Sequence, residues 1–80
     1  KDTSTVSVIT NKYGEAPSVL YGPDAESWYY LFVYPEKGIA YLGNPTTGTL
    51  LEIWYFPATN LEDFIKKWAT SYSPSLAPKF

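Results

Sequence analysis

The sequence predicts an α+β fold, a three- or four-stranded antiparallel meander sheet with one or two helices packed on one face. Three observations support this prediction. An amphipathic run lies near the C-terminus, three aromatic and β-branched runs precede it, and the connections between those runs are short. A chain of 80 residues allows one domain. We expect that domain to span residues 1–72, with a Pro- and Ser-containing tail or linker over residues 73–80.

The first element, over residues 4–13, fits either a helix or a strand. The apolar residues with helical spacing are Val6, Ile9 and Tyr13. Asp2 or Thr3 would then cap the helix, and Gly14 would end it. The β-branched residues between Thr5 and Thr10 favour a strand instead. The pattern alone leaves both interpretations open.

The middle of the chain predicts strands joined by tight turns. The predicted strands are residues 18–21, 28–34, 39–43 and 49–56. Residues 35–38 combine Pro and Gly in a turn, and residues 44–48 repeat that chemistry. Short connections between successive strands imply an antiparallel meander.

The clearest element is a helix over residues 61–71. Its apolar stripe consists of Leu61, Phe64, Ile65, Trp68, Ala69 and Tyr72. Asn60 is a favourable N-cap, and Asp63 stands at the capping-box position. Pro74 lies beyond the predicted end and would stop the helix.

Three stretches carry a resemblance to a known family: Thr5 to Pro17, Trp28 to Tyr30 and Leu50 to Phe56. Together they resemble the small outer-membrane-assembly lipoproteins of the SmpA/OmlA type and the related repeat of the β-lactamase inhibitory protein. The resemblance implies a helix over residues 4–13, a helical layer on an antiparallel sheet, and an extracytoplasmic protein that binds other proteins. The chain departs from the family pattern in having one initial helix instead of two and in adding the helix from Leu61.

The composition excludes several functions. The six basic residues are all lysines, and the formal charge of −2 argues against nucleic acid as a partner. The absence of Cys and His removes the usual metal ligands, nucleophile–base pairs and general bases. We therefore predict no enzyme activity, no catalytic residue, no cofactor and no metal. No apolar run reaches the length of a transmembrane helix, whereas a membrane tether preceding Lys1 is compatible with this sequence.

Aromatic side chains are the best candidates for a binding site. The residues selected are Trp28, Tyr30, Tyr34, Tyr41 and Trp54. The strands have apolar side chains on both faces, and a helical layer on one face would leave the other uncovered. Glu52 is expected to point to water if Leu51, Ile53 and Tyr55 face inward.

The leading hypothesis is a non-catalytic protein–protein interaction domain with an exposed aromatic sheet face, probed by alanine substitution at the selected residues. The alternative is a module that binds a sugar, a lipid or a peptide. Packing of both faces by the chain itself would instead make the chain a structural subdomain.

Overall fold

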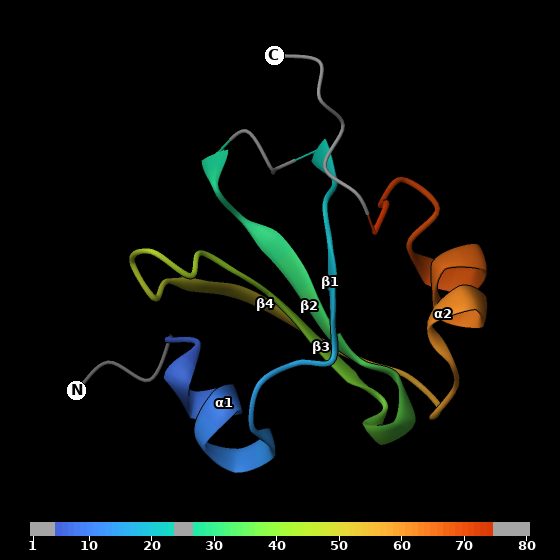
Figure 1. Cartoon of the computed structure of the whole chain (residues 1–80), viewed down its shortest axis with the longest axis horizontal. Coiled ribbons are helices and arrows are strands. Elements are labelled where there is room, and N and C mark those ends of the chain that lie inside the picture. Colours follow the sequence, from blue (N-terminus) through green and yellow to red (C-terminus); the bar gives the residue numbers. More distant parts are fainter. Residues whose placement is uncertain (1–4, 24–26, 75–80) are drawn as a thin grey trace.

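The computed structural model describes residues 5–23 and 27–74 (Figure 1). In chain order the elements are α1 (Ser7–Tyr13), β1 (Ser18–Leu20), β2 (Tyr30–Tyr34), β3 (Ile39–Gly43), β4 (Leu50–Tyr55) and α2 (Leu61–Trp68). The strands form one antiparallel sheet in the order β1-β2-β3-β4. This arrangement confirms the α+β class and the meander.

The turn between β2 and β3 follows the predicted chemistry. Pro35–Lys37 forms a single 3₁₀ turn, and Gly38 adopts a left-handed conformation with φ of 71°. A Cβ atom at Gly38 would collide with the Phe56 carbonyl oxygen. Only glycine therefore fits this position, both for its backbone angle and for the close approach of the chain after β4.

Helix α2 begins as predicted. The Asn60 side chain accepts a hydrogen bond from the Asp63 backbone N–H at 2.8 Å, which satisfies one of the free donors of the first turn. The helix ends at Trp68 instead of residue 71, because Ala69 leaves the helical conformation at φ −136° and ψ 46°.

The first element is a helix, as the family resemblance implied. It begins at Ser7 after Val6, which makes no side-chain cap hydrogen bond. The expected caps Asp2 and Thr3 lie outside the described residues, and the helix starts too late for either to be its N-cap. Gly14 ends α1 with φ of 81° and donates its N–H to the Thr10 carbonyl oxygen.

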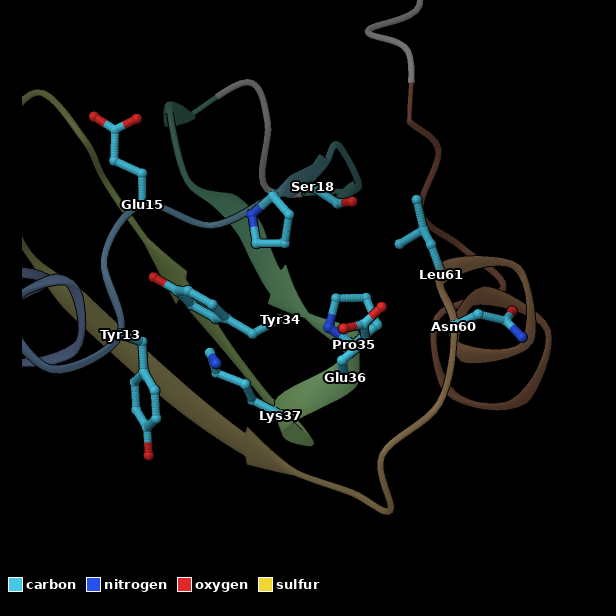
Figure 2. Close-up of a pocket in the computed structure, with 10 residues that line it drawn as sticks. Tyr13, Glu15, Ser18, Tyr34, Pro35, Glu36, Lys37, Asn60 and Leu61 are labelled. Carbon is cyan, nitrogen blue, oxygen red and sulfur yellow. The ribbon is translucent and has the colours of Figure 1, made fainter.

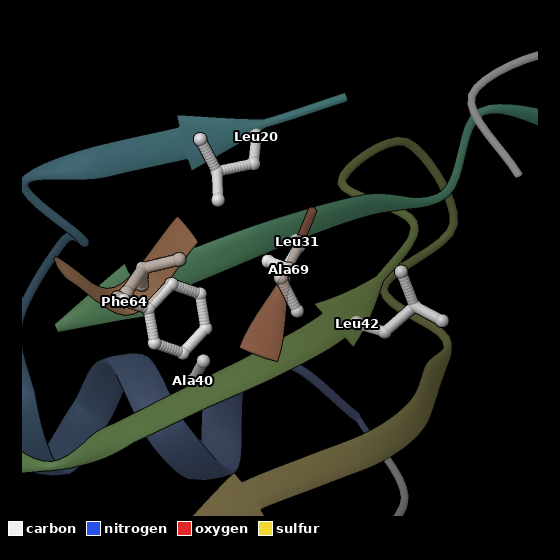
Figure 3. Close-up of a cluster of buried hydrophobic side chains, with 7 residues drawn as sticks. Leu20, Leu31, Ala40, Leu42, Phe64 and Ala69 are labelled. Atoms are coloured by element: carbon white, nitrogen blue, oxygen red, sulfur yellow. The ribbon is translucent and has the colours of Figure 1, made fainter. Parts of the chain in front are cut away.

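The two helices cover opposite faces of the sheet, so the prediction that both pack on one face is wrong. Successive strand residues alternate between two buried clusters. We call them the α2 cluster (Leu20, Leu31, Val33, Ala40, Leu42, Phe64 and Ala69) and the α1 cluster (Ile9, Tyr34, Ile39 and Tyr41). Figure 3 shows Phe64 of α2 lying over Ala40 among the strands. Because β2 and β3 are apolar on both faces, they need a cover on each side.

Candidate functional site

Two of the selected tyrosines are structural. Tyr34 and Tyr41 are buried in the α1 cluster, and Phe32 stacks on Tyr41 with ring centroids 4.8 Å apart. The Tyr34 hydroxyl donates to the carbonyl oxygen of Gly14, which ties β2 to the end of α1. Neither ring is exposed enough to form a contact surface for a protein partner.

Burial also changes the acidity of these two hydroxyls. It raises the pKa of Tyr34 above its usual value, and the Glu15 carboxylate adds to the rise. Burial, then the neighbouring Tyr34, then Glu15 raise the pKa of Tyr41 to about 12. Both phenols therefore stay protonated through the neutral range, where they act as packing groups and, for Tyr34, as a hydrogen-bond donor.

Tyr30 and Trp54 are half-buried against different neighbours. Tyr30 packs edge to face on Tyr21, at 5.0 Å between ring centroids. Trp54 lies on the opposite face of the sheet, in the α2 cluster, and its Nε1 donates to Glu52 Oε1 at 2.9 Å. Glu52 is exposed, as predicted.

Trp28 stands apart from the others. Its side chain is 63% exposed. Its backbone has a positive φ of 68°, which no other non-glycine residue has in the part of the chain that the structure describes. This backbone conformation removes Trp28 from β2, which begins at Tyr30 and not at residue 28. The five selected residues are thus divided between two faces and a loop and do not form one surface.

The exposed apolar side chains gather instead on β4, which is an edge strand. Leu51 is 52% exposed, Ile53 37% and Tyr55 77%. We call these three residues and the open side of their strand the β4 edge. Ile53 and Tyr55 lie opposite Tyr41 and Ile39, and therefore on the face that α1 covers only in part.

Among the described residues, the backbone of β4 has no partner on its outer side at two of these three residues, Ile53 and Tyr55. Phe56 donates its N–H to the Gly38 carbonyl oxygen at 3.1 Å, so that Phe56 faces β3. Hydrogen-bonding direction alternates along an antiparallel strand, so Glu52 and Trp54 also face β3. Ile53 and Tyr55 then direct their N–H and C=O groups away from the sheet.

A β-bulge sets which side chains lie together. Leu42 pairs with Glu52 but Gly43 pairs with Leu50, which leaves Leu51 as an extra residue. The bulge places Leu50 on the α1 face with Ile53, whereas unbroken alternation would have put it with Glu52. No turn or composition signal marks this bulge. The condition that Leu51, Ile53 and Tyr55 face inward is not met, because all three side chains are exposed and α1 covers the face of Ile53 and Tyr55 only in part.

The other edge of the sheet differs in length and in cover. β1 has three residues, and the chain beyond it is paired, because Tyr21 and Ser73 exchange two backbone hydrogen bonds of 2.8 and 2.9 Å. β4 has six residues, and its outer edge is paired at Thr49, where Thr5 forms an antiparallel bridge, whereas Ile53 and Tyr55 have no strand partner on that side among the described residues. A short paired edge is protected against additional strands, and β4 is the strand that offers a template.

A hollow of about 500 Å³ lies between the end of α1, the 3₁₀ turn and the start of α2. We call it the Pro35 hollow; it is lined by Tyr13, Glu15, Pro17, Ser18, Tyr34, Pro35, Glu36, Lys37, Asn60 and Leu61. Figure 2 shows Glu15 and Tyr13 on one side of it, Leu61 and Asn60 on the other, and Pro35 between them. The Asn60 side chain is already used as the α2 cap.

Within residues 5–23 and 27–74, no three acidic side chains come together in a way that could hold a metal ion. In the same ranges, neither helix has the length and hydropathy needed to cross a bilayer. Comparisons with models of known families, with curated proteins and with solved structures found no match.

Proposed function

We propose that this chain is a non-catalytic protein-interaction domain whose partner adds an extended strand to the β4 edge. One observation carries the proposal: at Ile53 and Tyr55 an exposed apolar side chain and outward backbone groups occur at the same residue. Strand addition uses both, since main-chain hydrogen bonds supply affinity and alternate side chains supply specificity. Open edge strands usually carry lysine or proline as protection, and between Leu50 and Tyr55 there is neither.

An extracytoplasmic location is part of the proposal. It is supported by the resemblance of Thr5 to Pro17 and Trp28 to Tyr30 to the envelope lipoproteins. Immunodetection in cell fractions tests it, and recovery of the protein with the cytosolic fraction alone would contradict it.

A display selection of random twelve-residue peptides against the immobilised chain tests the function. We expect the enriched peptides to alternate apolar and polar residues. They should bind Ile53→Pro at least about tenfold more weakly, which corresponds to about 1.4 kcal/mol. Proline at residue 53 removes the outward N–H and leaves the bonds to β3 in place. Thermal unfolding of the variant checks that the sheet is retained.

The matched control is Val8→Lys, because Val8 is a β-branched residue of α1 with 46% exposure. It should bind the same peptides as the unchanged chain, whereas Ile53→Lys should not. Equal binding to Ile53→Pro and to the unchanged chain, or no enrichment at all, would contradict the proposal.

A second candidate is the binding of a small molecule in the Pro35 hollow, favoured by its volume of about 500 Å³ and by its aromatic and carboxylate lining. Titration of a glycan and peptide panel, followed through the backbone amides of residues 36–38, distinguishes it from strand addition. Shifts confined to this turn would favour the hollow, and shifts confined to β4 would favour the edge.

A further inference from the structure

We propose that the strand added to the β4 edge is β4 of a second copy of this chain, paired antiparallel about a two-fold axis at Ile53. This inference rests on the proposed function and names its partner. The resulting dimer would join two four-stranded sheets into one continuous sheet.

The backbone groups fit this symmetric register. With the axis at Ile53, each Ile53 lies opposite Ile53 of the second copy, and Leu51 lies opposite Tyr55. Ile53 and Tyr55 are the residues whose N–H and C=O groups point outward, as the Phe56 to Gly38 hydrogen bond requires. The two Ile53 residues can therefore exchange a pair of backbone hydrogen bonds.

The side chains are also self-complementary. On the α1 face, the register places the exposed Ile53 side chains of the two copies opposite each other, with the exposed Tyr55 rings on either side of them. On the other face, Glu52 comes opposite Trp54 of the second copy. This is the same pair that already forms a hydrogen bond of 2.9 Å within one chain.

The chain's own pairing near Thr5 limits the length of this register. The segment at Thr5 already pairs antiparallel with Thr49, where Val6 donates its N–H to the Gly48 carbonyl oxygen at 2.9 Å. Because Thr5 already lies opposite Thr49 on this edge, pairing with the second copy is confined to residues 51–55, and the second copy's chain must turn away from β4 before its Pro57. Within that limit, the chain's own pairing at Thr49 and the second copy use different parts of β4.

The dimer is expected to be weak. Six residues of one strand bury less than the roughly 1,200–2,000 Å² of stable interfaces. The two Glu52 carboxylates also become diagonal neighbours, at about 7–8 Å in an antiparallel pair. Removal of that repulsion should tighten the dimer, and loss of the outward N–H should weaken it.

Sedimentation equilibrium of the full chain up to about 1 mM tests the inference. We expect a monomer–dimer equilibrium that Ile53→Pro weakens at least about tenfold. Glu52→Gln should strengthen it about two- to fivefold, because glutamine keeps the acceptor for Trp54 Nε1 and removes the charge. The opposite directions of these two variants separate strand pairing from loss of folding. Val8→Lys, the control on α1, should leave the equilibrium unchanged.

A monomer at about 1 mM would overturn the inference, as would a dimer unaffected by Ile53→Pro. If that monomer still binds the selected peptides at β4, the proposed function stands and the partner is a different polypeptide. If the monomer binds none and its Ile53 amide exchanges slowly with solvent, the β4 edge is already occupied within the chain and both proposals fail.

Discussion

The two faces of the sheet are covered to different extents. Helix α2 has eight residues and a side-chain cap, and its cluster reaches from Leu20 on β1 to Trp54 on β4. Helix α1 has seven residues and no side-chain cap, and its buried partners are mainly on β2 and β3. As a result, Trp54 packs against the α2 cluster on one face of β4, whereas Tyr55 is exposed to solvent on the other.

The difference shows how a small domain can fold and still keep an interaction surface. The α2 face supplies aliphatic and phenylalanine packing across the whole sheet, and the rings around Phe64 extend it to Phe56 and Trp68. The α1 face uses tyrosines, whose hydroxyls need partners when buried. The uncovered part of that face is the β4 edge.

The largest expected effect is on the α2 face. Phe64→Ala removes a fully buried ring that contacts Trp54, Phe56 and Trp68, and it should lower the free energy of unfolding by about 3–5 kcal/mol. Ile9→Ala, the matched truncation on the α1 face, should cost about 2 kcal/mol. Urea unfolding of both variants measures the difference. If Ile9→Ala lowered the free energy of unfolding as much as Phe64→Ala or more, the conclusion that the α2 face is the better packed one would be wrong.

Alkaline pH should destabilise the fold through the buried tyrosines of the α1 face. Because folding raises the pKa of Tyr41 to about 12, the native state holds this proton more tightly than the unfolded chain does. The resulting stability is complete below about pH 10 and is lost as pH rises towards 12, a loss of about 2–3 kcal/mol.

Urea unfolding between pH 8 and 12 measures this loss. Tyr41→Phe should reduce the dependence, since phenylalanine has no proton to lose, and the part that remains is expected from Tyr34, whose pKa is also raised by burial. A slope in Tyr41→Phe as steep as in the unchanged chain would assign the alkaline loss to other groups.

Removal of the N-cap of α2 should have a smaller effect on stability. Asn60→Ala removes the acceptor for the Asp63 N–H and should cost about 1 kcal/mol. Asn60→Asp keeps an acceptor at the same place and should restore most of the stability. Thermal unfolding of both variants checks this prediction, and equal losses would show that the cap adds little to α2.

How far the sequence predicts this structure depends on the element. Local chemistry predicted the turn at Gly38 and the cap at Asn60, because both depend on neighbours in the chain. Placement of α1 on the opposite face is a tertiary choice, set by the need of Tyr34 and Tyr41 for cover, and periodicity does not encode it. The site was harder still to predict, because aromatic residues such as Tyr34 are buried in the core, whereas Ile53 and Tyr55 lie beyond the cover that α1 provides.

The smallest expected effect is at the β4 edge itself. Tyr55→Thr removes a ring that is largely in solvent, so the free energy of unfolding should change by less than about 0.5 kcal/mol. Dilute protein is needed for this measurement, so that self-association does not contribute. A loss above about 1 kcal/mol would mean that Tyr55 is part of the core.

Amide hydrogen exchange along β4, resolved by residue in dilute protein, tests the openness of this edge most directly. The structure predicts that the Glu52 and Trp54 amides, which face β3, are protected, and that the Ile53 and Tyr55 amides exchange rapidly. At high protein concentration, Ile53 and Tyr55 should become protected as well. Protection of all four amides at high dilution would contradict an open β4 edge.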